Sequence, residues 1–418
     1  MKARHSLACT IAALSLVALH ARADSDQDRE RDRDRTTTVD CAAGDTVARA
    51  LRHGDERKSL TILINGSCSE HVVISRSDIK LAPAAPGATI SGPDPTIDVI
   101  RVTGTRVTID GITVTGGRNG ITADGAAGLI VQNAVLRGTG RNGITYAHGA
   151  SGVVDNCTVL NNARDGVAIE SAAATVINSQ VNQNGRMGVG VFNGGSARIG
   201  VDNFNVGAGN TISANASNGI HIVFGSTAII AMNQITGNGT SDAPGNLRIG
   251  VNLASATADF IGGNTISGNA GTGVNLVRSS ANFGDANFGG ITTVNTITGN
   301  GNPVSQAGVV AFNGSSVTIR DAVISNNVAF GVVLSFRSSA QIGNNAIQNN
   351  VAIGPGTGDG IRLVLGSGLF GTTPNGAVTG NAGFGLNCTD GESSVINIGL
   401  LGIGANTLGG VGPTCTGF

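Results

Sequence analysis

A repeat in which a glycine is followed by an aliphatic residue limits the fold of this sequence more than any other feature. The glycine recurs at intervals of 22 to 35 residues, most often 23. The eleven marker glycines are Gly120, Gly143, Gly166, Gly188, Gly219, Gly250, Gly273, Gly308, Gly331, Gly360 and Gly385. An asparagine stands four residues before many of them, at Asn162, Asn184, Asn215, Asn269, Asn327 and Asn381. Repetition at such an interval indicates one structural unit stacked many times.

The residues after each marker glycine alternate in polarity. Val167 and Ile169, or Ile220 and Ile222, are apolar, whereas the residue between them is free to be polar. This period of two is typical of a strand with one buried face. Because the chain has 65 glycines and many β-branched residues, a stack of helices is excluded. We therefore predict a single-domain, all-β solenoid, a parallel β-helix with coils about 4.8 Å apart.

The marker residues have a role in such a stack. The asparagine amides can bond to one another along the axis and tolerate a left-handed turn, and the glycines are expected where a turn needs positive φ. The longer intervals predict loops. Inserts at 239–249, 301–307 and 351–359 should leave one corner, and inserts at 202–209 and 285–293 a second corner.

From about Gly111 to Leu408, these stacked markers resemble the right-handed parallel β-helix repeat family of exported bacterial proteins, which shares its fold with pectate lyases and polygalacturonases. The resemblance covers most of the chain and implies a right-handed solenoid. It does not assign an activity, because the same scaffold hosts lyases, hydrolases, epimerases and adhesins.

The N-terminal region predicts export. Lys2 and Arg4 precede an apolar run at 7–19, and Ala21 and Ala23 form a small-x-small cleavage site. We expect residues 1–23 to be a signal peptide removed near Ala23, which indicates a secreted or periplasmic protein. The apolar run is too short to span a membrane.

A charged segment follows the expected signal peptide. Residues 24–35 read DSDQDRERDRDR, so we expect a disordered leader at 24–38 and a folded domain at 39–418. Asp45 is the predicted N-cap of a short helix through Val47 and Leu51 that covers the first coil. The alternation at 60–64 predicts the first strand.

The cysteines pair by spacing. Cys41 with Cys68, and Cys388 with Cys415, are each 27 residues apart, which is close to one coil. Residues one coil apart have the separation that a disulfide needs, so we predict one disulfide at each end. Cys157 has no such neighbour and is predicted to be a packed interior thiol. No cysteine or histidine spacing predicts a metal site, and no cofactor is expected.

The charges exclude some functions. With 27 acidic and 26 basic residues the formal net charge is -1, which does not suggest a nucleic-acid-binding surface. Paired carboxyls for glycoside hydrolysis must lie within about 5 to 10 Å of each other, and the only close acidic pair in the body is Asp390 with Glu392. A lyase needs a base near a cation, yet no lysine follows Lys80.

The best candidate catalytic group is Asp124, His148 and Glu170. They fall four or five residues after successive marker glycines and should share one edge of the stack, with Tyr146 nearby. Two coils would separate Asp124 from Glu170 by roughly 9 to 10 Å, a wide spacing even for an inverting pair. The alternative is that all three are solvated residues at strand ends.

A column of arginines is more regular. Two residues before the marker glycine stand Arg118, Arg141, Arg164, Arg186 and Arg248, interrupted by Ser217. On neighbouring coils such charges repel by roughly 0.8 kcal/mol per pair even in water. Either the side chains splay into solvent, or they form a ladder of planar donors for an extended anionic polymer.

Two functions are compatible with these features. We predict a secreted, non-catalytic protein that binds or organises polysaccharide, an acidic one included, or serves as a rigid surface scaffold. The alternative is a carbohydrate-active enzyme, a polysaccharide lyase or glycoside hydrolase, with an atypical site. Whether the chain is an enzyme stays open, as do its glycan and its oligomeric state.

Overall fold

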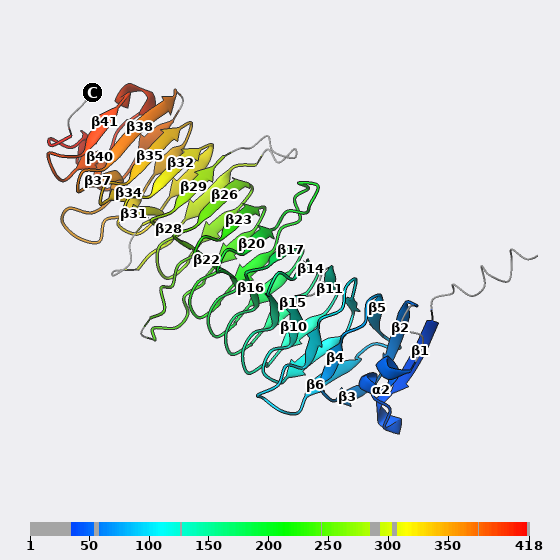
Figure 1. Ribbon diagram of the computed structural model, residues 1–418. Helices are drawn as coiled ribbons and strands as arrows, with labels where there is room; N and C mark the ends of the chain where they lie inside the picture. The colour runs from blue at the N-terminus through cyan, green and yellow to red at the C-terminus, as the bar shows by residue number, and fades with distance from the viewer. Residues whose placement is uncertain are drawn as a thin grey trace, which may run out of the picture.

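The computed structural model describes residues 35–53, 58–125, 128–243, 245–284, 293–302, 307–374 and 376–415. The expected signal peptide and leader up to residue 34 lie outside these residues. The described chain forms an elongated rod of stacked coils with its two ends at opposite ends of the rod (Figure 1). Three long parallel sheets, named A, B and C here, run the length of the rod.

Each coil visits the three sheets in turn. For example, β16 (Val167–Glu170) lies in sheet C, β17 (Ala173–Ile177) in sheet A and β18 (Gln180–Asn182) in sheet B, after which β19 (Val189–Phe192) returns to sheet C. β19 pairs in parallel with β16, residue for residue, from Val167 opposite Val189 onward. The predicted parallel β-helix is therefore confirmed.

Within the described residues, each sheet contains one strand per coil. Sheet A comprises β1 (Arg35–Asp40), β2 (Leu60–Asn65), β5 (Ile79–Pro83), β8 (Thr108–Asp110), β11 (Leu129–Gln132), β14 (Ser151–Asp155), β17, β20 (Ser196–Ile199), β23 (Thr227–Ala231), β26 (Thr257–Gly262), β29 (Ser280–Phe283), β32 (Ser316–Arg320), β35 (Ser339–Gly343), β38 (Gly368–Thr373) and β41 (Ser394–Ile396).

Sheet B comprises β3 (Ser67–Ser69), β6 (Thr89–Gly92), β9 (Thr113–Gly116), β12 (Val135–Arg137), β15 (Thr158–Leu160), β18, β21 (Thr211–Ser213), β24 (Gln234–Thr236), β27 (Thr265–Ser267), β30 (Asn295–Thr298), β33 (Ala322–Ser325), β36 (Ala346–Gln348) and β39 (Ala377–Thr379). Sheet C comprises β4 (Val72–Ile74), β7 (Ile100–Val102), β10 (Ile121–Asp124), β13 (Ile144–Ala147), β16, β19, β22 (Ile220–Val223), β25 (Val251–Ala254), β28 (Val274–Val277), β31 (Val309–Phe312), β34 (Phe330–Ser335), β37 (Asp359–Val364), β40 (Phe384–Cys388) and β42 (Gly409–Val411).

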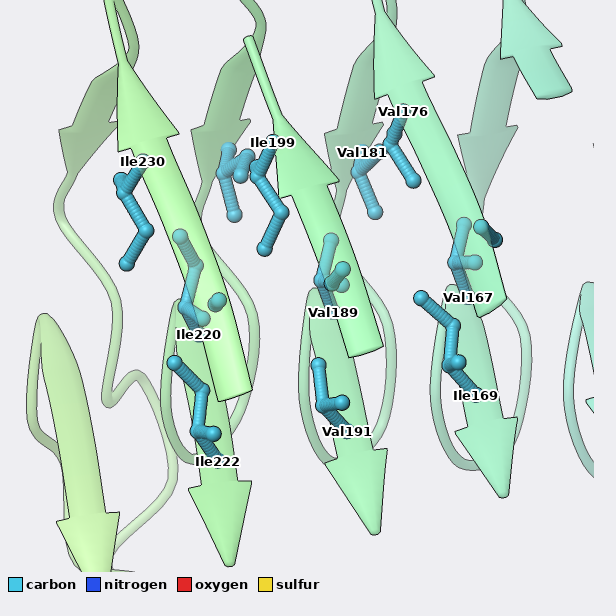
Figure 2. Packing of buried hydrophobic residues seen from close by; sticks show 14 of the residues in the cluster. Val167, Ile169, Val176, Val181, Val189, Val191, Ile199, Ile220, Ile222 and Ile230 are labelled. Atoms are coloured by element: carbon cyan, nitrogen blue, oxygen red, sulfur yellow. The ribbon is translucent and has the colours of Figure 1, made fainter. Parts of the chain in front are cut away.

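The core consists of aliphatic side chains stacked on their counterparts one coil away (Figure 2). Val167, Val189 and Ile220 form one such stack on sheet C, and all three are fully buried. Burying a side chain of this size contributes about 1.5 to 3 kcal/mol. A slip of one residue would turn every buried side chain outward, so this pattern sets the register of the coils.

A continuous asparagine column stabilises the turn between sheets B and C. In it the Asn184 side chain donates to Asn215 Oδ1 at 3.0 Å, and the backbone N–H of Asn215 donates to Asn238 Oδ1 at 3.1 Å. The column comprises Asn162, Asn184, Asn215, Asn238, Asn269, Asn300, Asn327, Asn350, Asn381 and Asn406. The spacing rule missed Asn238, Asn300 and Asn350 because inserts separate them from the next marker glycine.

The backbone conformation of the turn between sheets B and C differs from the expected one. None of the eleven marker glycines has positive φ. A side chain at Gly188 would instead place its Cβ 2.8 Å from Asn215 Nδ2 and 2.7 Å from the Gly219 carbonyl oxygen, so the asparagine column itself requires the glycine. The left-handed residue is the one before the column asparagine, such as Gln183 at φ 54°, at every column position except Asn406. The glycines thus make room for the next coil and do not form the turn.

The N-terminal cap also differs in detail from the prediction. The helix α2 (Val47–Arg52) begins at Thr46, whose side chain accepts the Arg49 N–H, and not at Asp45. Glu70 accepts the N–H groups of Val47 and Ala48 at 2.8 and 3.0 Å, which satisfies the helix start. Strand β1 precedes this helix and begins at Arg35, so the folded chain starts before Val39 and the strand at Leu60 is the second. Two short 3₁₀ helices, η1 (Cys41–Ala43) and η3 (Ile398–Leu401), lie near the ends.

Both predicted disulfides are present. Cys41 and Cys68 have Cα atoms 5.0 Å apart, and Cys388 and Cys415 have Cα atoms 4.8 Å apart. Cys157 is a buried free cysteine, and burial raises the pKa of its thiol to about 12. A thiol of this kind is unreactive at neutral pH. It occupies a core position, as expected.

The loops leave the corners that the sequence indicates. Residues 239–249 and 351–359 both connect a strand of sheet B to a strand of sheet C, and so does 301–307, of which 303–306 lie outside the described residues. Residues 202–209 connect sheet A to sheet B, whereas 285–292 are not described. In the described part of the chain no helix has the length and apolar character needed to cross a membrane.

Candidate functional site

The outer face of sheet C carries most of the candidate residues. The second residue of each strand lies on the face opposite to its core-facing neighbours, although several of these residues, such as Ala168 and Asn252, are buried themselves. Consecutive coils bring these outward residues into one row, namely Thr122, Thr145, Ala168, Gly190, His221, Asn252 and Asn275. The row contains a histidine and two amides next to small residues, and it runs beside the turns that hold the arginines.

The structure brings together only part of the predicted catalytic trio. His148 Nδ1 lies 2.6 Å from Asp124 Oδ1, and Arg101 pairs with the other oxygen of the same carboxylate. These contacts, first His148 and then Arg101, lower the pKa of Asp124. Glu170 lies two strands away, in register with Asp124 across Ala147, and contacts neither residue within the described chain.

This arrangement does not suit acid–base chemistry. A carboxyl group with a lowered pKa is a poor proton donor, and its partners occupy both of its oxygens. Tyr146 is fully buried and its hydroxyl donates to the Leu129 and Val153 carbonyl oxygens, so it points into the core and away from Asp124. We interpret Arg101, Asp124 and His148 as a surface ion-pair cluster.

Three arginines lie on consecutive coils in close register. The backbone N–H of Arg164 donates to the Arg141 carbonyl at 2.8 Å, and that of Arg186 donates to the Arg164 carbonyl at 2.9 Å. Arg118 precedes them by one coil, whereas Ser217 takes the next position after Arg186. We call Arg118, Arg141, Arg164 and Arg186 the arginine column.

Arg248, which the spacing predicted as the fifth member of this column, has a different environment. Its backbone has φ 59°, and its guanidinium pairs with Asp242 in the insert at 239–249. The insert therefore supplies a counter-charge that sequence spacing did not reveal. Arg248 is neutralised within the chain.

Arg186 is also neutralised, by a buried carboxylate. Its Nε lies 2.6 Å from Asp165 Oδ1 and its Nη2 pairs with the other oxygen, while Asp165 has no exposed side-chain surface. Burial lowers the pKa of Arg186, but the hydrogen bond and charge of Asp165 outweigh it and raise the pKa overall. The pair is a bidentate one, the strongest geometry for arginine and carboxylate.

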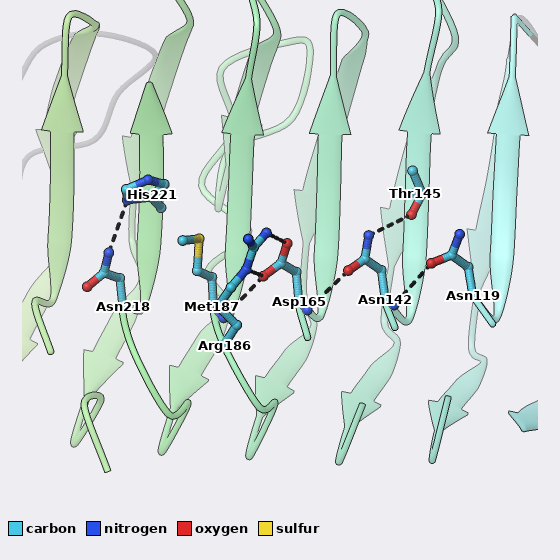
Figure 3. A network of polar contacts seen from close by, with 8 residues as sticks. All are labelled: Asn119, Asn142, Thr145, Asp165, Arg186, Met187, Asn218 and His221. Carbon is cyan, nitrogen blue, oxygen red and sulfur yellow. Dashed lines mark hydrogen bonds and ion pairs between the residues drawn. The ribbon is translucent and has the colours of Figure 1, made fainter. Parts of the chain in front are cut away.

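Asp165 belongs to a short polar column at the edge of sheet C (Figure 3). The Asn142 N–H donates to Asn119 Oδ1 at 3.1 Å, the Asp165 N–H to Asn142 Oδ1 at 3.2 Å, and the Met187 N–H to Asp165 Oδ1 at 3.3 Å. Aspartate thus replaces asparagine as a backbone acceptor. The replacement brings in a buried negative charge that Arg186 has to balance.

Arg141 and Arg164 have no such partner. Neither forms an ion pair with any described residue, and Arg141 Nε is buried without a hydrogen bond. Burial, followed by the charges of Arg186 and Arg141, lowers the pKa of Arg164. At the centre of the arginine column, therefore, no ion pair with a described residue neutralises the positive charge, and the carboxylates of Asp165 and Glu170 act on Arg164 only at longer range.

A histidine that the sequence analysis did not single out lies on the next coils. The Arg186 guanidinium sits 5.6 Å from the centroid of the Phe192 ring, and the Phe192 and His221 rings are 6.0 Å apart. Asn218 and Asn252 both contact His221 Nδ1 at 3.0 Å. Burial, and then the charge of Arg186, lower the pKa of His221 to about 4. The sequence did contain a signal for this contact, because aligning the coils by their marker glycines places His221 next to Asn252.

The site therefore combines hydrogen-bond donors with carboxylates, of which Asp124 and Asp165 are already held in ion pairs. Among the described residues no three His, Cys, Asp or Glu side chains come together as metal ligands would. Arg141, Arg164, Arg186 and His221 present guanidinium and imidazole groups along one side of sheet C. Such an array can bind anionic groups that repeat along the axis of the rod.

The stacked sheets define a right-handed parallel β-helix protein, and residues 62–206 match the family model described as "Right handed beta helix region". Among solved structures, a mutant of the periplasmic alginate epimerase AlgG is 12% identical, covers 90% of this chain and 83% of its own, and has a TM-score of 0.46. The A-module of the Azotobacter vinelandii mannuronan C-5 epimerase AlgE4 is 15% identical, with 89% and 92% covered and a TM-score of 0.40. Pectate lyase Pel9A is 13% identical, with 69% and 78% covered and a TM-score of 0.39. These likenesses concern the fold alone, and no curated protein matches the chain.

Proposed function

We propose that this protein is a secreted or periplasmic, non-catalytic β-helix that binds an acidic polysaccharide along sheet C. One observation carries the proposal. Arg141 and Arg164 lie on neighbouring coils without an ion-pair partner among the described residues, and Arg141 Nε is buried without a hydrogen bond. An external carboxylate would supply the counter-charge that both guanidinium groups lack.

The geometry of the scaffold supports a polymeric ligand. Coils are spaced by about 4.8 Å, so an extended chain lying along the rod would meet guanidinium groups at regular intervals. A rigid array of this kind loses little conformational entropy on binding. The two disulfides suit an oxidising compartment outside the cytoplasm, where such polymers occur.

A lyase is the second candidate, and one observation favours it. His221 lies near Arg186, and β-elimination from a uronate needs a base close to a cation that neutralises the carboxylate. Against this role, the carboxylates near the two residues are Asp165, which is bound by Arg186, and Glu170, which lies in register with Phe192 and whose charge acts on Arg186. Non-catalytic binding therefore remains our proposal.

The test is a screen of the purified protein against polygalacturonate, alginate and a neutral glucan. Calorimetry should show binding to the uronates and only background with the glucan. Ultraviolet absorbance should show no unsaturated product. Unsaturated product would establish the lyase, and equal binding of the neutral glucan would contradict the proposal.

A further inference from the structure

His221 sits in a chain of amides whose orientation the structure determines. The first amide is Asn218, whose Oδ1 accepts the backbone N–H of Ile249 at 3.1 Å. Because that oxygen is used by a donor, the Nδ2 group of Asn218 is the one that faces His221 Nδ1 (Figure 3). An amide fixed in this way acts as a hydrogen-bond donor to the imidazole.

The second amide, Asn252, is oriented through its neighbour Asn275 and agrees with the first. Asn252 Oδ1 accepts a hydrogen bond from Asn275 Nδ2 at 2.8 Å. Its own Nδ2 therefore points to His221 Nδ1, at 3.0 Å. Two donors now converge on one ring nitrogen, which must be an unprotonated acceptor.

It follows that the proton of the neutral imidazole resides on Nε2. Nε2 makes no hydrogen bond with any described residue, and it is not one of the buried unpaired atoms of the described chain, so it reaches solvent. A second proton would have to enter Nδ1 against both amides, which agrees with the lowered pKa of His221. The charged groups that face this ring are Arg186 and Asp165, and Asp165 is already bound by Arg186.

We propose that Arg186 and His221 form a subsite for one carboxylate of the bound polysaccharide, in which His221 donates from Nε2 as a neutral imidazole. Both residues lie beside the Phe192 ring, with the guanidinium carbon 5.6 Å and the imidazole centroid 6.0 Å from its centroid, and the charge of Arg186 acts on His221. Asp165 uses two of the five guanidinium N–H groups and leaves the others available. The subsite rests on the proposed function for its ligand class, and it assigns His221 a donor role in place of a base.

The protonation of His221 can be measured without a ligand. Nitrogen-15 NMR of the imidazole, assigned by comparison with His221→Gln, should show the Nε2–H form from pH 8 down to pH 5. In Asn252→Asp a carboxylate faces Nδ1, so the ring should become protonated near neutral pH. A wild-type ring that is Nδ1–H, or that titrates like an exposed histidine, would overturn the inference.

Binding to polygalacturonate tests the ligand role. His221→Ala should weaken affinity roughly tenfold, because a donor to a charged acceptor is lost, whereas His221→Gln should lose less than half of that effect. His148→Gln is the control and should match wild type. Wild-type affinity should not change between pH 5.5 and pH 8.

The outcomes separate the two proposals. If Arg141→Gln with Arg164→Gln abolishes binding while His221→Ala has no effect, the proposed function stands and the subsite is wrong. If wild-type protein binds no uronate polymer, both proposals fail. Affinity that rises as pH falls through 6.5 would show a charged imidazole and would also overturn the subsite.

Discussion

Two columns of identical side chains run side by side in the turns between sheets B and C, and they differ in how their members interact. In the asparagine column each amide both donates and accepts, so Asn184, Asn215 and Asn238 satisfy one another. In the arginine column each member can only donate, and neighbours repel. The members of the first column satisfy one another, whereas those of the second depend on anions that the column itself does not supply.

The members of the arginine column also differ in whether an anion within the fold neutralises them. Arg186 has obtained a buried internal anion, Asp165, whereas Arg141 and Arg164 have none among the described residues. Residues at equivalent positions of a repeat thus have unequal roles. We expect the asparagine column and Arg186 to matter for stability and Arg141 and Arg164 to matter for binding.

The largest effect is expected in the middle of the asparagine column. Asn215→Ala removes the acceptor of the Asn184 N–H and Nδ2 groups and the Nδ2 donor to Asn238 Oδ1 and the Val181 carbonyl. Leaving such buried groups unpaired should lower the free energy of unfolding by about 4 kcal/mol. Urea denaturation measures the change.

A control for this variant lies on the preceding coil. Gln180→Ala removes an exposed side chain from β18 and should change stability by less than about 0.5 kcal/mol. Equal effects of the two substitutions would show that the asparagine column is dispensable.

Arg186→Gln should cost about 3 kcal/mol, because it leaves the buried Asp165 carboxylate without a counter-charge. The double variant Arg186→Gln with Asp165→Asn restores neutrality and the backbone acceptor, and it should recover most of the loss. Thermal unfolding of the three proteins provides the measurement. No recovery in the double variant would contradict the assigned role of the pair.

Stability should also depend on the protonation of His221. The folded pKa is lowered to about 4, so below the unfolded pKa of about 6.5 the unfolded chain binds the proton more readily and stability falls as pH falls. The contribution should be about 2 kcal/mol between pH 8 and pH 5. His221→Gln should lack this component, which appears as the difference between the two pH profiles. Parallel profiles would contradict the buried, neutral state of the ring.

The smallest effect on stability is expected at Arg164. Its lowered pKa shows that burial and the neighbouring arginines disfavour its charge. Arg164→Gln should therefore change the free energy of unfolding by no more than about 0.5 kcal/mol, in either direction. If Arg164→Gln lowered the free energy of unfolding as much as Arg186→Gln, Arg164 would also stabilise the fold. The contrast between the two positions would then be wrong.

The sequence predicted the stack because identical residues must lie over one another. The spacing of Cys41 and Cys68 was enough to pair them for the same reason. Inserts concealed Asn238, Asn300 and Asn350 from the spacing rule. The marker glycines were predicted to form a turn of positive φ, whereas they are needed because a side chain there would collide with the next coil.

The site was harder to predict, because its contacts join different coils. The arginine column could be read from spacing, but its neutralisation by Asp165 and that of Arg248 by Asp242 depend on side-chain packing. His221 meets Asn218 of its own coil and Asn252 of the next coil only in the folded structure. Asp124, His148 and Glu170 shared an edge in the sequence pattern, yet only the first two come into contact.

The central claim is that Arg141 and Arg164 bind a polyanion through positive charge that no ion pair with a described residue neutralises. Titration of polygalacturonate into wild type, Arg141→Gln with Arg164→Gln, and the charge-matched control Arg137→Gln with Arg320→Gln tests it most directly. Arg137 and Arg320 are exposed on β12 and β32, away from sheet C.

Wild type and the control should bind with equal affinity that weakens with salt, since exposed charges are screened over about 8 Å at physiological ionic strength. The Arg141 and Arg164 variant should bind at least tenfold more weakly, which corresponds to about 1.4 kcal/mol, with unchanged stability. Equal binding by all three proteins, or binding insensitive to salt, would contradict the account.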